Sequence, residues 1–421
     1  MKRGFYTIMS AQFCSSLADN ALFVVAVELL RTSGAAEWQR AALVPMFALF
    51  YVLLAPFVGA FADALPKGRV MLISNAIKVL GCLMMLTGWH PLLAYAVVGL
   101  GAAAYSPAKY GILTELLPAS QLVKANGWIE GLTIASIILG VLLGGQLVAP
   151  HLAQPLLALG LPGITLAAEA AIVALVPLYA LAALFNLRIP RTRAQLQPMP
   201  RQPLALLHDF WRCNLSLWRD KLGQISLATT TLFWGVSGNL RYIVLAWAAV
   251  ALGYDTSQAS ALVGVVAVGT AAGAVWASMR MRLNKATRVI PLGILMGLLV
   301  VAMNAIDRLW MAVPFLILLG GLGGFLVVPM NALLQHRGHN LMGAGRSIAV
   351  QNFNEQAAIL GMGTFYSLSA SMGLSAFGAI TVFGLLVASV MWLIGLWMAY
   401  NTRHHRKEMA RLLGIARRDE H

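Results

Sequence analysis

The stretch "GAFADALPKGRV" (residues 59–70) interrupts a long apolar part of the chain. Apolar runs flank it at about residues 41–62 and 70–88. Each run is near the roughly 20 residues that a helix needs to cross a bilayer core about 30 Å thick. The stretch itself brings together an aspartate, a proline and two cations, which are unfavourable in hydrocarbon. It is therefore typical of a short polar loop between two membrane-spanning helices.

The composition of the whole chain agrees with this interpretation. Of 421 residues, 59% are hydrophobic and 11% are charged, and the mean hydropathy is +0.77. Soluble domains carry about 25% charged residues. The first apolar run begins near Phe5 and has no clear A-x-A cleavage site, so we expect it to remain as a spanning helix. We therefore predict an all-α polytopic membrane protein.

Apolar runs of spanning length recur along the chain. They predict twelve transmembrane helices, at about residues 5–30, 41–62, 70–88, 92–113, 126–148, 164–186, 223–250, 258–279, 289–304, 309–334, 345–370 and 375–400. Twelve spans place both termini on the same side of the membrane.

Basic residues decide which side that is. Of the 30 Lys and Arg residues, 24 fall on the side of the termini, 3 on the opposite side and 3 within spans. Cytoplasmic loops are enriched in Lys and Arg, so both termini and the central linker are predicted to be cytoplasmic. The formal net charge of +15 is explained by this bias, and no nucleic-acid partner is expected.

The basic, proline-bearing segment 188–222 separates six spans from six. We predict an N-terminal six-helix bundle (1–187), this cytoplasmic linker, a C-terminal six-helix bundle (223–400) and a basic cytoplasmic tail (401–421). Residues 205–218 fit either a short amphipathic helix on the inner leaflet or an ordinary solvated linker. For the tail we expect no role beyond contact with the inner leaflet.

The two halves carry a weak internal repeat. Residues 99–111 ("GLGAAAYSPAKYG") and 321–333 ("GLGGFLVVPMNAL") both contain Gly-Leu-Gly, five further residues and a proline. Asn20 in the first span and Asn239 in the seventh also occupy similar settings. Pseudo-symmetric halves are typical of transporters whose substrate site lies between them near the bilayer midplane.

Charged residues inside spans are the main candidates for a site. Asp19 and Arg241 lie at similar depth in two spans that the repeat relates, and we predict that they form an ion pair. The pair fits a structural lock, a substrate site or both. Lys78 lies near mid-depth in the third span, and Lys109 follows Pro107 in the fourth.

Three glutamates complete the set. Glu28 lies near the outer end of its span and is expected to reach the interface. Glu130 lies near the cytoplasmic end of the fifth span, and Glu355 lies about ten residues into the eleventh. The three scattered cysteines, Cys14, Cys82 and Cys213, predict neither disulfides nor a metal site.

Catalytic motifs are missing from the sequence. There is no Gly-x-x-x-x-Gly-Lys-Ser/Thr for ATP and no His-x-x-x-x-Asp acyltransferase pair. His336 and His339 are expected in a solvated cytoplasmic loop. We therefore predict a protein that is not an enzyme and has no cofactor.

The loop 59–70 resembles the signature between the second and third helices of the major facilitator superfamily. Gly59 and Asp63 match its Gly-x-x-x-Asp, and Gly68 and Arg69 match its Gly-Arg. Two departures are visible: four residues rather than two separate Asp63 from Gly68, and Lys67 precedes Gly68. The resemblance implies a major facilitator superfamily fold with two pseudo-symmetric six-helix bundles.

Longer stretches are similar to one family, the bacterial lysophospholipid transporters. The resemblance rests on "AQFCSSLADNAL" (11–22), "APFVGAFADALPKGRVM" (55–71), "VGLGAAAYSPAKYGIL" (98–113), "LVKANGWIEGLTIA" (122–135), "LFWGVSGNLR" (232–241), "GGFLVVPMNALLQHRG" (323–338) and "GAGRSIAVQNFNE" (343–355). It implies import of lysophospholipids, chiefly lysophosphatidylethanolamine, from the outer to the inner leaflet of the bacterial inner membrane, where a separate acyltransferase restores the second chain. It also implies that Asp19, Lys109 and Arg241 are the buried functional charges.

The residues suit such a substrate, which carries a phosphate and an ammonium. Arg241 has the donor geometry for phosphate, and Lys109 adds a point charge. The ammonium has three candidate acceptors, Asp19, Glu130 and Glu355. The hydroxyls have two candidate partners, Asn20 and Asn239. We expect a monomer that contacts membrane lipids.

Two other functions fit the sequence. One is a proton-coupled exporter of amphipathic drugs on the same fold, with Asp19 and Glu355 as proton carriers. The other is a non-transporting, lipid-sensing scaffold that recruits an acyltransferase through its basic linker and tail.

Overall fold

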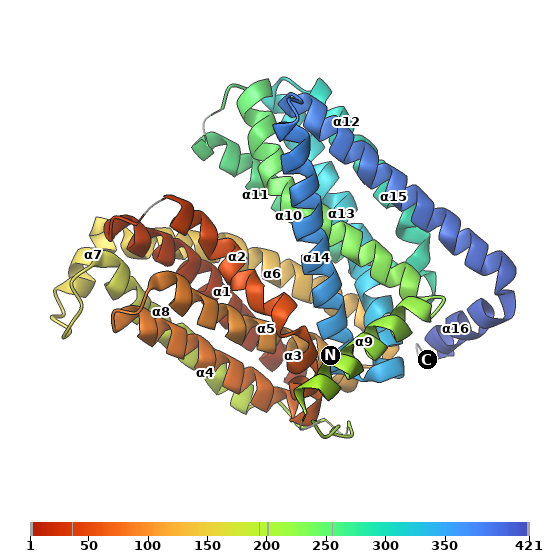
Figure 1. The fold of residues 1–421 in the computed structure, drawn as a ribbon, viewed down its shortest axis with the longest axis horizontal. Helices are drawn as coiled ribbons and strands as arrows, with labels where there is room; N and C mark the ends of the chain where they lie inside the picture. The colour runs from red at the N-terminus through yellow and green to blue at the C-terminus, as the bar shows by residue number, and fades with distance from the viewer. Residues whose placement is uncertain (1–2, 36, 193, 200–201, 255, 419–421) are drawn as a thin grey trace. The chain divides into compact units, whose positions relative to one another are not determined.

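The computed structural model describes residues 3–35, 37–192, 194–199, 202–254 and 256–418, and every regular element among them is helical (Figure 1). The helices are α1 (Arg3–Thr32), α2 (Glu37–Leu53), α3 (Ala55–Ala64), α4 (Lys67–Leu86), α5 (Pro91–Leu116), α6 (Ala119–Val148), α7 (Pro150–Leu157), α8 (Ala167–Leu187), α9 (Pro203–Arg219), α10 (Gly223–Ala251), α11 (Thr256–Arg280), η1 (Leu283–Val289), α12 (Ile290–Ala302), η2 (Met303–Ala305), α13 (Leu309–Met342), α14 (Ala344–Ser371), α15 (Ala376–His404) and α16 (Arg406–Arg418).

Helical segments occupy all twelve predicted spans, and the second span is broken. Its two parts, α2 and α3, meet at Leu54 with a bend of 70°. Pro56 lies in the first turn of α3, where a proline fits because the N–H it lacks has no partner inside the helix. Pro56 also has no N–H to donate to the carbonyl of Val52 four residues earlier, and its ring clashes with that carbonyl, which accounts for a break at this point.

The described residues contain nine single helices that are long and apolar enough to cross a membrane, or ten if α2 and α3 form one span. α10 and α14 occupy the seventh and eleventh predicted spans but are not among these ten. The multi-pass membrane architecture is therefore confirmed, and the count of twelve stays a prediction.

The chain divides into two compact units. The first comprises residues 1–116, 135–211 and 342–350, and the second comprises 117–134, 212–341 and 351–421. Long helices such as α6 and α14 therefore contribute to both units. The predicted bundle boundaries at residues 187 and 223 stay a prediction.

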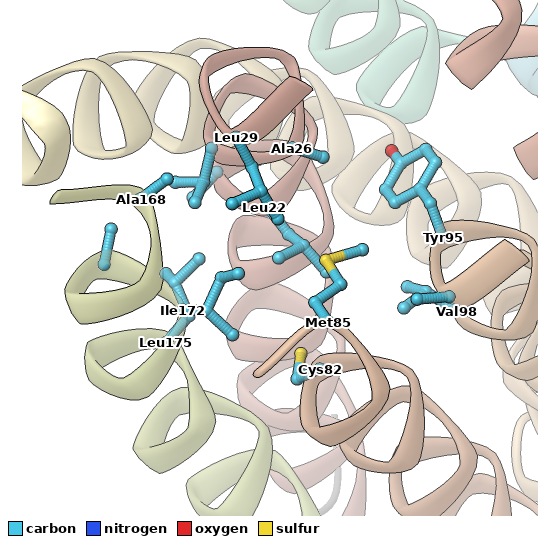
Figure 2. Packing of buried hydrophobic residues seen from close by; sticks show 14 of the residues in the cluster. Leu22, Ala26, Leu29, Cys82, Met85, Tyr95, Val98, Ala168, Ile172 and Leu175 are labelled. Carbon is cyan, nitrogen blue, oxygen red and sulfur yellow. The ribbon is translucent and has the colours of Figure 1, made fainter. Parts of the chain in front are cut away.

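The core of the first unit forms where α1, α4, α5 and α8 meet (Figure 2). Leu22, Ala26 and Leu29 recur at a spacing of four and three residues, which places them on one face of α1. They pack in one cluster with Met85 of α4 and Ile172 of α8, and all five are nearly or fully buried. This apolar packing holds α5 against α1, α4 and α8, the three helices that carry the charged site described below.

Glycines permit the closest helix contacts in both units. A Cβ at Gly140 or Gly144 of α6 would lie within 2.7 Å of backbone oxygens of α1. In the second unit a Cβ at Gly269 or Gly273 of α11 would lie within 2.3 Å of backbone oxygens of α13. Small residues four apart allow helices to pack backbone to backbone, which suits association in lipid.

The linker contains the helix that one of the two sequence interpretations expected. α9 covers 203–219, and Leu206, Phe210 and Leu217 on one of its faces are nearly or fully buried. Because this apolar face packs on protein, it is not available to lipid. A second stripe, with Leu204 and Trp211, is exposed.

The tail is also helical. α15 continues to His404, and α16 then packs against η1 with Met409, Leu412 and Ala416 buried at a spacing of three and four residues. The opposite face of α16 carries exposed cations.

One loop assignment was wrong. His336 was expected in a solvated loop, but α13 continues to Met342 and His336 is only 6% exposed. His339 is half-buried and belongs to the same helix. The helix extends beyond its apolar residues because polar side chains such as Asn331, Gln335 and Arg337 are also buried in it.

Candidate functional site

A buried ion pair joins the first and third spans inside the first unit. The ammonium of Lys78 on α4 donates to Asp19 Oδ2 on α1 over 2.6 Å and to Ser15 Oγ over 2.9 Å. The hydroxyl of Tyr179 on α8 donates to the other carboxylate oxygen of Asp19 over 2.8 Å. Ser15 in turn donates to Asn75 Oδ1 over 2.7 Å. We call Ser15, Asp19, Asn75, Lys78 and Tyr179 the Asp19 cluster.

Helix register brings these side chains together. Ser15 and Asp19 are four residues apart on α1, and Asn75 and Lys78 are three apart on α4, so each pair shares a helix face. Gly101 of α5 makes room for the lysine, because a Cβ there would lie 2.7 Å from Lys78 Cγ. The side chain of Lys78 is 2% exposed and that of Asp19 is 16% exposed. The pair is therefore largely withdrawn from solvent.

Aromatic rings surround the lysine. Its Nζ lies 4.9 Å from the ring centre of Tyr105 and 5.8 Å from that of Tyr179, both within the range of cation–π attraction. Two buried polar atoms beside this arrangement, Tyr105 OH and Asn75 Nδ2, have no hydrogen-bond partner among the described residues. A buried unpaired donor is costly, so the cluster retains capacity for a further acceptor.

Asp19 thus has a partner that the sequence analysis did not select. Lys78 was recognised as a mid-depth charge but was not included in the predicted site, and Ser15, Asn75 and Tyr179 were missed. The available signal was the polar row Ser74, Asn75 and Lys78 on a single face of the third span. The side chain of Arg241 lies outside the described residues, so its pairing with Asp19 stays a prediction.

Two other predicted residues belong to the first unit. Asn20 donates to its own helix, from Nδ2 to the Ser16 carbonyl over 2.8 Å, and so does not point its amide at the Asp19 cluster. Lys109 of α5 is 9% exposed, and its ammonium lies 4.2 Å from the ring centre of Tyr110. Lys109 is therefore a buried cation, as expected.

The second unit holds the remaining predicted polar residues. Asn239 of α10 donates to the Gly235 carbonyl over 2.8 Å and to the Ile359 carbonyl of α14 over 3.0 Å, which ties the two helices together. Glu355 is 8% exposed, and its Oε1 accepts from Gln351 Nε2 over 2.7 Å. The Glu130 side chain lies outside the described residues.

The 59–70 stretch forms a second charged site in the first unit. Asp63 accepts from the backbone N–H groups of Gly345 (2.7 Å) and Arg346 (2.9 Å), the second and third residues of α14. Lys67 lies 2.8 Å from Asp63 and 3.3 Å from Glu115. The start of a helix thus supplies two hydrogen bonds to Asp63, and Arg69 is not a partner of Asp63 in the described interactions.

The guanidinium of Arg346 extends this site. Its Nε donates to Asp209 over 2.7 Å, and its Nη1 lies 3.3 Å from Asp63. We call Asp63, Lys67, Glu115, Asp209 and Arg346 the Asp63 cluster. A carboxylate at a helix N-terminus satisfies unpaired N–H groups and favours the helix dipole, so this cluster holds the start of α14.

The glycines of the motif permit close contacts. A Cβ at Gly59 would lie 2.8 Å from Ala349 Cβ and 3.1 Å from Arg346 Cα, so only glycine lets α14 approach α3 this closely. A Cβ at Gly68 would lie 3.1 Å from the Asn186 carbonyl. Arg69 is exposed.

Comparison with known proteins agrees with this architecture. The sequence model of the Major Facilitator Superfamily matches residues 8–362. The solved structure of the transporter FucP in the outward conformation superposes with a TM-score of 0.71 at 14% identity, covering 94% of this chain and 98% of FucP. The human organic anion transporter MFSD10 gives a TM-score of 0.71 at 15% identity, covering 94% of this chain and all of that one. The chain belongs to the Major Facilitator Superfamily of membrane transporters.

Similar proteins identify the family within this superfamily. The lysophospholipid transporter LplT of Yersinia enterocolitica is 42% identical over 374 residues, which is 89% of each chain. That of Yersinia pestis is also 42% identical over 89% of this chain and 88% of its own. Within the superfamily, this chain belongs to the lysophospholipid transporter family, and it is a transporter rather than an enzyme.

Proposed function

We propose that this protein moves lysophospholipids, chiefly lysophosphatidylethanolamine, from the outer to the inner leaflet of the bacterial inner membrane for reacylation. The Asp19 cluster is the observation that carries the proposal. It places a cation and an anion side by side in a core that is otherwise apolar, and the headgroup of lysophosphatidylethanolamine carries the complementary pair. Phosphate would replace Asp19 beside Lys78, and the ammonium would replace Lys78 beside Asp19.

The exchange explains how binding would drive movement. An unpaired buried charge is costly, so each charge of the protein must keep a partner throughout. A zwitterionic headgroup supplies both partners at once and would release Asp19 and Lys78 from each other. Freed side chains then allow the helices to rearrange, which is how a ligand shifts a protein between states in alternating access.

Other charged residues are placed along the same route in this proposal. Lys109 and Arg241 would attract the phosphate, and Glu130 and Glu355 the ammonium. Asn20 and Asn239 would contact hydroxyls in a rearranged state. We place both termini and a cytoplasmic acyltransferase on the inner side of the membrane, and we expect a monomer.

Charge-removing substitutions in spheroplasts test the proposal. Asp19→Asn, Lys78→Met, Lys109→Met and Arg241→Gln should each reduce uptake of radiolabelled lysophosphatidylethanolamine at least tenfold. Ser278→Ala is a control, since its hydroxyl donates to the Val275 carbonyl of its own helix. Near-normal uptake by all four variants would contradict the assignment. Uptake that collapses with an uncoupler would favour proton coupling instead.

A paired substitution separates a substrate site from a structural lock. Removing Lys78 alone strands Asp19, which should cost about 3–5 kcal/mol of stability, whereas replacing both partners is often close to neutral. We therefore expect Asp19→Asn with Lys78→Met to recover the unfolding temperature without recovering uptake. Recovery of both would mean that the pair serves structure alone.

A further inference from the structure

The segment before α4 forms one wall of a cavity that is separate from the Asp19 cluster. The cavity has a volume of about 260 Å³ and lies between the start of α4 and the end of α8. Its lining residues are Pro66, Gly68, Arg69, Leu72, Asn186, Leu187, Ile189, Pro190 and Arg191. Arg69 is nine residues before Lys78 on α4, or about 14 Å along the helix axis.

The cavity is positive and holds no acid. Arg69 and Arg191 are both exposed, and neither guanidinium forms an ion pair or a hydrogen bond with any residue in the described part of the chain. No aspartate or glutamate is among the nine lining residues. Two free guanidiniums on one cavity favour an anion, and their forked donors match phosphate oxygens.

An unsatisfied amide marks the same cavity independently. Asn186 is 2% exposed, and neither its Nδ2 nor its Oδ1 has a partner among the described residues. Its backbone carbonyl is already used, accepting from the N–H of Ile189 over 3.2 Å. Nearly all buried side-chain amides are hydrogen-bonded, and an anion in the cavity would supply the acceptor that Nδ2 lacks.

The start of α4 adds to the attraction. Its N-cap is Pro66, which forms no side-chain cap. The first turn of a helix presents N–H groups without partners inside the helix and a partial positive charge. Gly68 has no side chain to cover this turn, and a Cβ there would press against the Asn186 carbonyl at 3.1 Å.

We propose that this cavity binds a phosphate group through Arg69, Arg191 and the amide of Asn186. The site goes beyond the proposed transport function, because it belongs to the outer surface of α4 and α8. Leu72 and Leu187 line it, Leu187 is 65% exposed, and Leu184 one turn earlier is 58% exposed. A phospholipid could therefore place its phosphate in the cavity and its acyl chains along these leucines. A free phosphate would satisfy the same polar groups.

Ligand titration of the purified full-length chain tests the site. One arm uses dioleoyl phosphatidylglycerol and the other inorganic phosphate, each followed by the ligand-induced rise in unfolding temperature. Arg69→Gln with Arg191→Gln should weaken binding at least tenfold. Arg188→Gln is the matched control, because it removes an exposed charge nearby that does not line the cavity. It should bind within twofold of the unaltered chain.

The two arms identify the source of the phosphate. Binding of the lipid alone supports a headgroup site, and binding of both probes supports a site for free phosphate as well. The proposal is overturned if neither probe binds, if the double variant binds as the unaltered chain does, or if Arg188→Gln weakens binding equally. If the double variant does not fold, Arg191→Gln alone tests the site, because Arg191 lies outside the helices.

Discussion

At the scale of single residues, Lys78 is the side chain that organises the candidate site. It contacts Asp19 and Ser15 of α1 and lies near the ring of Tyr179 on α8, so one lysine links three helices. The aliphatic stem passes Gly101 of α5 on its way to these partners. Space at position 101 is therefore as important to the site as charge at position 78.

Gly101→Ala should displace Lys78 and reduce transport. The added methyl would lie 2.7 Å from both Lys78 Cγ and the Ser74 carbonyl, and overpacking of this kind costs about 1–3 kcal/mol. Gly145→Ala is the control, since nothing lies within 4 Å of its Cβ. The unfolding temperature and the uptake should both fall for Gly101→Ala, and for Gly145→Ala they should be unchanged or higher. If the two variants give the same unfolding temperature and uptake, the contact between Gly101 and Lys78 does not have this role.

Sequence alone predicted the charges but not their pairing. Depth along the spans and the internal repeat favoured Arg241 as the partner of Asp19, and Lys78 was noted only as a charge near mid-depth. Which helices are neighbours depends on three-dimensional packing, and the structure packs α1 beside α8 and α4 beside α8. Tyr179 could not be found because a tyrosine in an apolar run usually serves packing.

At the scale of elements, the 59–70 stretch acts on a helix nearly 300 residues away in sequence. Asp63 accepts from two N–H groups in the first turn of α14, and Lys67 and Arg346 neutralise its charge. The sequence indicated that Asp63 belongs to a motif but not which helix it contacts. Long-range partners of this kind leave no local pattern.

Asp63→Ala should loosen the start of α14. Loss of a capping carboxylate typically costs about 0.5–2 kcal/mol, and Lys67 keeps Glu115 and the Ala62 carbonyl as partners. Hydrogen exchange at the Gly345 and Arg346 amides should accelerate about tenfold. Asp307→Ala, an exposed site, should leave it unchanged. Unaltered exchange in the Asp63 variant would show that the cap contributes nothing.

At the scale of the whole molecule, the internal repeat has a structural counterpart. In the first unit, Gly99 of α5 packs against the backbone of α2, and in the second, Gly321 of α13, its counterpart in the repeat, packs against Gly273 of α11. In each unit the glycine-rich fourth span thus contacts the second span of its half. Pro107 and Pro329 both lie inside the helices that carry these glycines. The repeated sequence therefore specifies repeated packing.

Transport of a lysolipid by the purified chain is the central claim. The most direct measurement reconstitutes it in liposomes and follows the movement of fluorescent lysophosphatidylethanolamine between leaflets by extraction with albumin. We expect movement at least tenfold faster than in protein-free liposomes, and loss of that increase in the Asp19→Asn, Lys78→Met double variant. Movement equal to that of protein-free liposomes, or unchanged in the double variant, would contradict it.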